Sequence, residues 1–204
     1  MISNPEFRDR QQRSWAVRLA PPLVMILMMW LCYVIQVVVG PEVWRGFGIP
    51  AGGWDRLWSI VTAPFLHGGI MHLINNTIAM IWLGIMTAVE GPKRFWAVTI
   101  TAAIVSGIGV IMLSAPGSVT VGMSGVIFGY FGYILVAAFV EQNRRHKAVR
   151  IVSLAVFFMW WGTTFFAGFI PQGNMSWQAH LFGALGGGLV AIITERREAR
   201  AMQP

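Results

Sequence analysis

The chain has 204 residues, of which 56% are hydrophobic and only 11% are charged, and it contains ten tryptophans. This composition excludes an ordinary soluble domain and is typical of a membrane protein. The formal net charge of +7 could indicate nucleic-acid binding, but the placement of the basic residues along the chain decides against that class.

Four long stretches of the chain contain no Asp, Glu, Lys or Arg, and they predict the membrane spans: 19–41, 65–89, 95–140 and 151–194. About 20 apolar residues cross a bilayer, so the last two stretches are each long enough for two crossings. Turn-forming residues divide both of them, at 114–118 and at 171–174. We therefore expect an all-α polytopic membrane protein with six transmembrane helices.

Residues 1–18 are predicted to form a polar arm, residues 19–194 the membrane domain, and residues 195–204 a polar tail. The first apolar stretch exceeds the length of a signal-peptide core and lacks a small-x-small cleavage site before Glu42, so we interpret it as an uncleaved anchor. Cys32 is the single cysteine, so an intramolecular disulfide is excluded. It falls inside this span, where we expect it to be a small packing residue.

The predicted loop at 41–66 carries three tryptophans among glycines and prolines, Trp44, Trp54 and Trp58. Tryptophan is enriched where a protein meets the headgroup region of a bilayer. We expect this loop to lie in the outer membrane interface.

The basic residues fall on one side of the predicted topology. Thirteen of the 15 belong to the two ends of the chain and to the two loops on the same side, namely Arg8, Arg10, Arg13, Arg18, Lys93, Arg94, Arg144, Arg145, Lys147, Arg150, Arg196, Arg197 and Arg200. Only Arg45 and Arg56 belong to the other side. The positive-inside rule therefore predicts that both termini are cytoplasmic, and it explains the net charge without a nucleic-acid partner.

Five polar side chains inside or beside the predicted spans are candidates for function, because polar groups within a bilayer are costly: His67, His72, Asn76, Ser124 and His180. Ser124 lies between glycines in "VGMSGVIFG". The alternative to a reactive serine is close helix packing, since Gly125, Gly129 and Gly132 form a stripe of small residues.

Three predicted helices bring their polar residues to one depth. With the N-terminus inside, the second, fourth and sixth helices begin at the outer surface, and His72, Asn76, Ser124 and His180 fall within their first two turns. At 1.5 Å per residue this places all of them roughly 5 to 12 Å below the surface. Gly183 and Gly187 follow His180 on its own face and would let that helix approach the one carrying Ser124.

This layer predicts nucleophilic catalysis, in which His180 acts as the general base for Ser124. His72 and Asn76 are four residues apart and share one helical face, which suits an oxyanion hole together with the backbone N–H of Ser124. A polar clamp between helices is the alternative for these two residues. His67 lies off their face near the loop, and we expect a structural role for it.

No carboxylate is expected beside the histidine, because Glu90 lies 18 residues after His72, about 27 Å along a helix. A hydrolase at this site would therefore work with a Ser-His dyad rather than a triad. A zinc site is disfavoured because the chain has no H-E-x-x-H pattern and no acidic residue near the histidines. We expect neither a metal nor another cofactor.

Three segments together resemble the rhomboid intramembrane serine proteases: "TAPFLHGGIMHLINN" at 62–76, "GMSG" at 122–125 and "AHLFGALGG" at 179–187. The resemblance implies a six-helix rhomboid core in which Ser124 is the nucleophile, His180 the base, and His72 and Asn76 the oxyanion donors. Five further positions would support that site, namely Gly122, Gly125, Phe128, Gly183 and Gly187.

The chain departs from the family pattern at two places. Where relatives often have Trp-Arg in the first loop, this chain has Trp58-Ser59, and a Trp-Arg pair occurs earlier as Trp44-Arg45. Four residues after the serine, where many relatives have a tyrosine against the histidine, this chain has Phe128.

The expected activity is cleavage of single-pass or polytopic membrane-protein substrates within the bilayer near its outer face, in a bacterial plasma membrane. The fifth helix and the loop after it, with Gly162, Gly168, Pro171 and Gly173, are candidates for a substrate gate. The alternative is a non-catalytic membrane-protein binder or chaperone of rhomboid-like fold, although such proteins lack the serine or the histidine. A small transporter is disfavoured because the polar residues cluster near one face.

Overall fold

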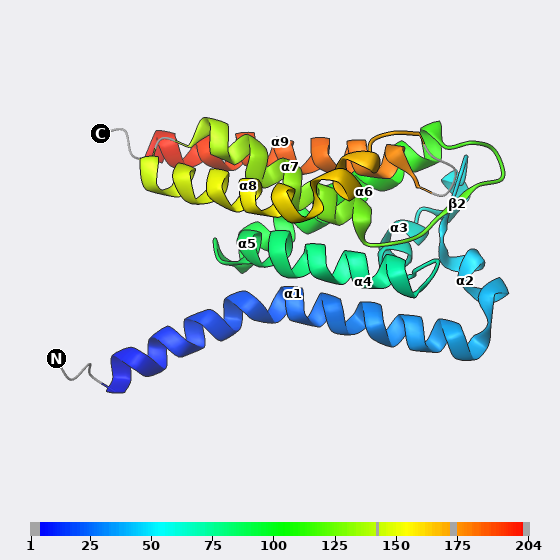
Figure 1. Ribbon diagram of the computed structural model, residues 1–204, viewed down its shortest axis with the longest axis horizontal. Helices are drawn as coiled ribbons and strands as arrows, with labels where there is room; N and C mark the ends of the chain where they lie inside the picture. Colours follow the sequence, from blue (N-terminus) through cyan, green and yellow to red (C-terminus); the bar gives the residue numbers. More distant parts are fainter. Residues whose placement is uncertain (1–4, 142, 172–174, 202–204) are drawn as a thin grey trace.

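The apolar stretches form a bundle of helices in a computed structural model that describes residues 5–141, 143–171 and 175–201 (Figure 1). The long helices are α1 (Pro5–Val39), α6 (Pro92–Leu113), α8 (Arg144–Ala167) and α9 (Trp177–Ala201). The second span is α4 (Ile70–Ala79), a π-helical segment η3 (Met80–Gly84) and α5 (Ile85–Ala88) in one continuous run. In the described residues, five helices are long and apolar enough to cross a membrane, and α7 (Ser124–Val140) is a shorter apolar helix. These six apolar segments confirm the predicted fold class.

Local sequence signals determine where several of these helices begin. Proline occupies the first turn of α6 after Gly91, whose φ of 117° favours glycine. The side chain of Asn143 caps α8 by accepting hydrogen bonds from the backbone N–H groups of Arg145 and His146, at 2.9 and 3.3 Å. Helix α1 begins at Pro5, so it continues through most of the predicted polar arm.

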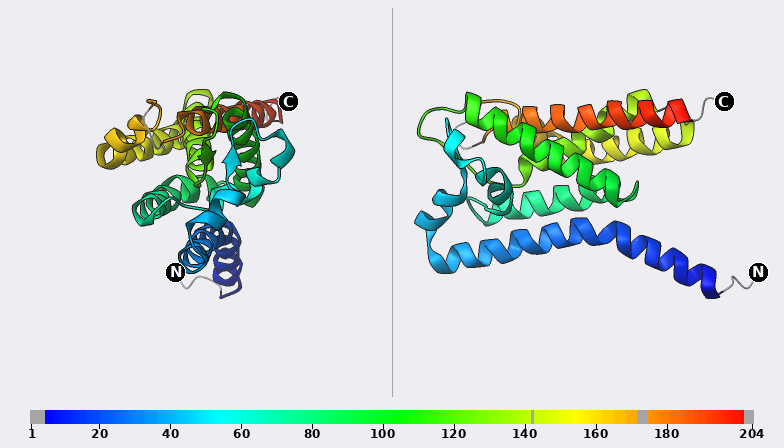
Figure 2. Two further views of the ribbon diagram at one scale, coloured as in Figure 1. Left: turned by 90° about the vertical axis from the view of Figure 1, so that its right-hand side faces the viewer. Right: turned by 180° about the vertical axis from the view of Figure 1, so that it is seen from behind.

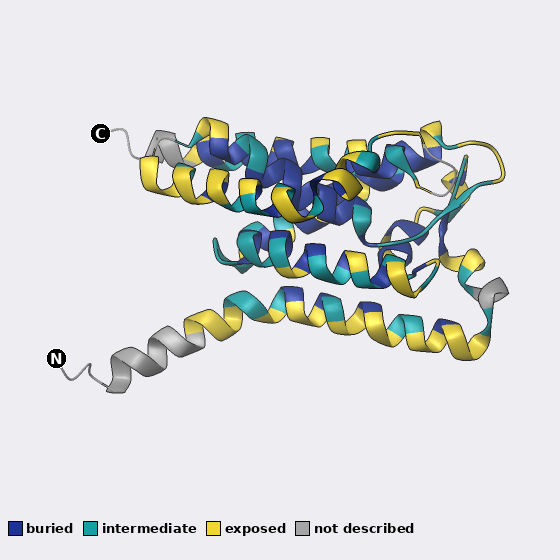
Figure 3. Cartoon of the chain, viewed as in Figure 1, coloured by how far each residue is buried: buried dark blue, intermediate teal, exposed yellow. Residues whose placement is uncertain are grey.

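Helix α7 forms the centre of the bundle and is buried along most of its length (Figure 3). It packs against α6, α8 and α9, while α1 lies to one side along α4 and α5 (Figures 1 and 2). The described side chains of α1 are largely exposed (Figure 3). The first turns of α1 and the last turns of α9 lie at the same end of the bundle (Figure 1). An even number of membrane crossings places both ends of a chain on the same side of the membrane. That this side is the cytoplasm remains a prediction.

Short elements close the opposite end of the bundle, which is the predicted outer end. They are α2 (Pro41–Phe47), η1 (Trp54–Arg56), α3 (Ser59–Thr62) and η2 (Ala63–Phe65). A two-stranded antiparallel sheet joins them to the loop before α7, because β1 (Ile49–Pro50) pairs with β2 (Val119–Thr120). The sheet thereby connects the first loop to the segment that directly precedes Ser124.

The first loop is anchored by an arginine two residues before Trp58. The guanidinium of Arg56 donates to the carbonyl of Gly46 and lies 5.3 Å from the centre of the Trp58 ring. The hydroxyl of Thr62 adds a hydrogen bond of 2.7 Å to the carbonyl of Phe47. Arg56 thus supplies a cation beside Trp58 although Ser59 stands where relatives often have arginine.

A buried ion network holds the helices together at the end near the chain termini. Arg150 of α8 is only 5% exposed and donates to Glu90 at 2.9 and 3.2 Å and to Glu195 of α9 at 3.0 Å. Glu90 also accepts from the hydroxyl of Tyr133 at 2.5 Å and from Arg94 at 2.9 Å. A buried charge is stable only when it is paired and hydrogen-bonded in this way. The network therefore fixes α6, α7, α8 and α9 to one another at this end.

Glycines allow α7 and α9 to make direct backbone contact. A Cβ atom placed on Gly183 would collide with the carbonyl oxygen of Gly125, and one placed on Gly187 would collide with that of Gly129. In the other direction, a Cβ on Gly132 would meet the carbonyl of Ala184. The stripe predicted from the sequence is therefore the contact surface of these two helices, as expected for small residues in membrane helices.

We expect Gly187→Ala to lower the thermal stability of the protein, because the backbone carbonyl of Gly129 cannot move aside as a flexible side chain could. Overpacking of this kind costs about 1 to 3 kcal/mol. The matched control is Gly162→Ala in α8, where the nearest atom to an added Cβ is Cβ of Phe158 at 3.5 Å, an ordinary contact. Melting temperatures in detergent would test this, and equal values for the two variants would contradict the packing argument.

Candidate active site

A cavity of about 880 Å³ lies at the predicted outer end, between α4, α8, the loop before α7 and the start of α9. The four residues predicted for the chemistry, His72, Asn76, Ser124 and His180, all line it. Its wall is otherwise formed largely by apolar side chains, including Phe157, Trp161 and Phe165 of α8, Val119 of the loop before α7 and Trp177 at the start of α9. The structure thus brings the predicted residues together at one cavity.

Ser124 is the first residue of α7, and its hydroxyl faces His180 of α9. The distance between Ser124 Oγ and His180 Nε2 is 2.8 Å, which is a hydrogen bond. Helix α7 has only 17 residues, about 25 Å, and is the shortest of the six apolar segments in the described residues. The contact of α7 with α9 at Gly125 and Gly183, one residue after the serine, makes the approach of the two side chains possible.

The other ring nitrogen of His180 is held by a backbone carbonyl. Nδ1 lies 2.6 Å from the carbonyl oxygen of Gly168, at the end of α8. A carbonyl can only accept, so Nδ1 carries the proton, and in the neutral ring Nε2 is then an acceptor facing the serine hydroxyl. From the sequence, Gly168 is predicted only as part of a gate. No sequence pattern shows that its backbone carbonyl will meet the His180 side chain, 12 positions later.

A column of aromatic rings sets the plane of the His180 ring. Phe128 stacks on it with 4.1 Å between ring centres and 6° between planes, and Phe165 of α8 stacks on the other face of Phe128 at 4.0 Å. Phe169 and Phe131 pack edge-on or tilted around this column. The stacked contact needs only the ring, so Phe128 can occupy the place where relatives have tyrosine.

His72 and Asn76 converge on Gly122, two residues before the serine. Gly122 has a φ of +117°, and a Cβ atom there would lie 2.5 Å from Cε1 of His72 and 3.4 Å from Nδ2 of Asn76. Asn76 is only 5% exposed, and its Nδ2 has no hydrogen-bond partner within the described part of the chain. A buried amide donor without a partner is costly and is a common feature of sites that receive a ligand or intermediate.

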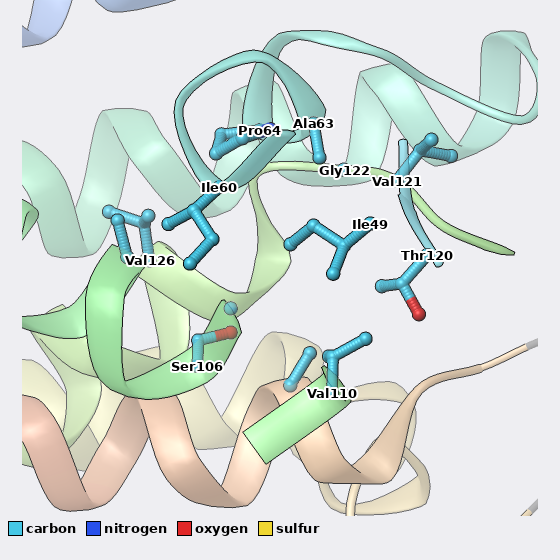
Figure 4. A pocket seen from close by; sticks show the side chains of 13 residues that line it. Ile49, Ile60, Ala63, Pro64, Ser106, Val110, Thr120, Val121, Gly122 and Val126 are labelled. Atoms are coloured by element: carbon cyan, nitrogen blue, oxygen red, sulfur yellow. The ribbon is translucent and has the colours of Figure 1, made fainter. Parts of the chain in front are cut away.

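A second, much smaller cavity of about 20 Å³ is lined by residues on both sides of Ser124 in the chain, among them Val121, Gly122 and Val126 (Figure 4). Ile49, Ile60 and Val110 face one another across it, and Ser106 contributes a hydroxyl to its wall (Figure 4). Thr120 and Val121 belong to the walls of both cavities. The segment at 120–121, shortly before the serine, therefore separates the small cavity from the large one.

The remaining predicted residues occupy different places. His67 is buried in the segment before α4, where burial lowers its pKa to about 3, and its ring packs edge-on against His72 with 5.1 Å between centres. Gly162 lies within α8, Gly168 and Pro171 border the cavity, and Gly173 lies outside the described residues. Within the described residues, no group of three or more His, Cys, Asp or Glu has the arrangement of a metal site.

Comparison with known proteins identifies the class. A family model described as the Rhomboid domain matches residues 55–197, which is more than half of the chain. The chain belongs to the rhomboid family of intramembrane proteases and is an integral, multi-pass membrane protein. The matched residues include all the helices that carry the predicted site.

Bacterial relatives extend this similarity over nearly the whole chain. The uncharacterized protein Rv1337 of Mycobacterium tuberculosis is 29% identical over 98% of this chain and 85% of its own length. The rhomboid protease GlpG of Yersinia pseudotuberculosis is 27% identical over 90% of this chain and 66% of its own length. The bacterial plasma membrane is the location that such relatives indicate.

We expect Gly122→Ala to destabilise the site more than an alanine at another glycine of positive φ. Both Gly122 and Gly117 (φ +79°) adopt a backbone conformation that costs a residue with a Cβ atom about 1 to 2 kcal/mol. Only at Gly122 would the Cβ also displace His72 and Asn76, because nothing lies within 4 Å at Gly117. Melting temperatures of the two alanine variants provide the test, and a larger fall for Gly117→Ala would contradict it.

Proposed function

We propose that this protein is an intramembrane serine endopeptidase that cleaves transmembrane helices of membrane-protein substrates near the outer face with a Ser124–His180 dyad. The observation that carries the proposal is the 2.8 Å hydrogen bond between Ser124 Oγ and His180 Nε2, in a ring whose Nδ1 is held by Gly168. A backbone carbonyl thus takes the orienting place that a carboxylate has in a triad. The rhomboid protease GlpG among the relatives supports the same reaction class.

In the proposed reaction, His180 Nε2 takes the hydroxyl proton while Ser124 Oγ attacks the carbonyl carbon of the scissile peptide bond. The resulting oxyanion accepts hydrogen bonds from the Ser124 backbone N–H, from Asn76 Nδ2 and from the His72 ring. The protonated His180 then gives its proton to the leaving amine, and the C–N bond breaks to leave an acyl-enzyme. A water molecule, deprotonated by His180, attacks the ester and restores the serine.

The cavity supports a substrate that arrives from the membrane. Its walls include Trp161, which is half-buried, and Thr164, which is exposed, both on α8. A helix must unwind before a serine can reach its backbone carbonyl, because helical carbonyls are engaged in hydrogen bonds. The loop residues that line the same cavity, such as Ser114 and Ser176, provide a polar environment for the unwound segment.

Replacement of either dyad residue should abolish cleavage without unfolding the protein. We expect Ser124→Ala and His180→Ala to reduce turnover of a transmembrane substrate by roughly 10⁴-fold or more, since removal of a nucleophile or its base has effects of this size. A serine-reactive fluorophosphonate should label the wild-type protein and not Ser124→Ala.

The matched control is Ser118→Ala, whose hydroxyl lies in the same cavity wall and donates only to Ala115 at 2.7 Å. This variant should retain turnover and labelling. Cleavage retained by Ser124→Ala would refute the dyad, and a wild-type protein that binds membrane proteins without cleaving them would favour the binder alternative.

Asn76→Ala and His72→Ala test the oxyanion hole separately from the dyad. Loss of one donor should reduce turnover about 10²- to 10³-fold, or roughly 3 to 4 kcal/mol of transition-state stabilisation, with little change in substrate binding. If the residues instead clamp helices together, the melting temperature should fall while turnover per folded molecule stays the same. Turnover and melting temperature measured on the same preparations distinguish the two roles.

A further inference from the structure

Few contacts hold the glycine pair that leads into α4 in place. Gly68 and Gly69 precede the helix, an added Cβ would meet no atom within 4 Å at either of them, and no side chain caps the helix start. Glycine gives a chain more conformational freedom than any other residue. His72 lies in the first turn of this helix, so its position depends on whatever fixes the residues just before it.

That fixed point is His67, and the group that fixes it belongs to α1. The side-chain amide of Gln36 donates from Nε2 to the carbonyl of His67 and accepts at Oε1 from its N–H, both at 3.0 Å. The amide thereby satisfies both polar groups of one backbone residue, as a neighbouring strand would. Gln36 is itself 9% exposed, so this pair is shielded from competing solvent.

The side chain of His67 does not provide an equivalent anchor. It is 1% exposed, and within the described part of the chain its ring has a hydrogen-bonding interaction only with the backbone of Phe65, two residues earlier in the same segment. Its pKa of about 3 keeps the ring neutral, so no ion pair holds it either. The ring packs instead against the edge or face of His72, with 5.1 Å between centres and 68° between planes. A contiguous series of contacts therefore runs from Gln36 through His67 to His72.

We propose that Gln36 of α1 is a positioning residue, which holds His72 in the oxyanion hole by fixing the backbone of His67. The inference rests on the proposed function, because it assigns the purpose of the contact to the oxyanion donors. It gives α1 a part in the site although that helix contributes no residue to the cavity. The His72 ring lies directly against Gly122. A shift of the His67 backbone would therefore move the His72 ring relative to Gly122.

The chain offers a matched control for the loss of a hydrogen bond between α1 and α4. Trp30 Nε1 donates to Thr77 Oγ1 at 3.1 Å, and this bond also joins the two helices but lies one turn beyond His72 and Leu73. Thr77→Val removes it and leaves the His67 backbone untouched. Gln36→Met removes the Gln36 pair with nearly the same side-chain volume. Gln36→Asn is a milder variant that keeps the amide but shortens its reach by one methylene.

We expect Gln36→Met to lower kcat per folded molecule at least 10-fold with KM within about 2-fold, Gln36→Asn to lower kcat in the same direction, and Thr77→Val to change neither. Wild-type protein and Ser124→Ala run in parallel show whether cleavage depends on the proposed nucleophile. If it does, and the Gln36 variants retain the kcat of Thr77→Val, the positioning role is overturned while the function stands.

A second readout needs no substrate. The chain has four histidines, so nitrogen-15 NMR of histidine-labelled protein in detergent gives few ring signals, and His72→Ala identifies those of His72. Gln36→Met or Gln36→Asn should shift the His72 ring signals, and Thr77→Val should leave them in place. Unchanged His72 signals in both Gln36 variants would overturn the inference even if no membrane protein were cleaved.

Discussion

The direct backbone contact between α7 and α9 is the constraint on which the rest of the site depends. Ser124 and His180 are 56 positions apart in the chain, and the hydrogen bond of 2.8 Å between them joins two helices that touch backbone to backbone. Gly132, Gly183 and Gly187 provide that approach, since a Cβ atom on any of them would collide with the backbone of the facing helix. In a bilayer such contacts are also a main source of helix association, because lipid is as apolar as leucine and burial of apolar surface provides little driving force. One packing arrangement therefore stabilises the fold and sets the distance between the Ser124 hydroxyl and the His180 ring.

The features that sequence could predict are those with a local or periodic signal. Charge-free stretches marked the spans, the placement of basic residues predicted the topology, and glycines at helical spacing marked the contact between α7 and α9. Helical phase placed His72 and Asn76 on one face, and the structure has both at Gly122. The common depth of Ser124 and His180 followed from counting residues from the predicted helix ends. Their joint position at one cavity agrees with that expectation, while their chemical roles remain proposals.

The features that sequence missed depend on backbone atoms or on partners far apart in the chain. The carbonyl of Gly168 has no residue-type signature, and neither has the N–H of His67 that pairs with Gln36. Glu90 was considered only as too distant from His72 to complete a triad, yet it is a central acceptor of the network around Arg150. Relatives often have an arginine directly after the tryptophan, whereas here Arg56 lies two residues before Trp58. Its long side chain reaches the Trp58 ring and the carbonyl of Gly46 from that position.

Helix α8 both lines the cavity and ends at the carbonyl that holds the ring of His180. At the end near the chain termini, Arg150 binds three carboxylates, and Trp82 of η3 donates to the hydroxyl and carbonyl of Ser153 at 3.1 and 3.3 Å. Separation of a buried charged partner costs about 3 to 5 kcal/mol, so this end is held firmly. At the outer end α8 is held by ring contacts such as Phe165 on Phe128, each worth about 0.5 to 1.5 kcal/mol beyond area burial. Displacement of α8 therefore costs least at the outer end, where Gly168 holds Nδ1 of His180 and Trp161 and Thr164 line the cavity. A movement of α8 at this end would change both the width of the cavity and the contact between the carbonyl of Gly168 and Nδ1 of His180.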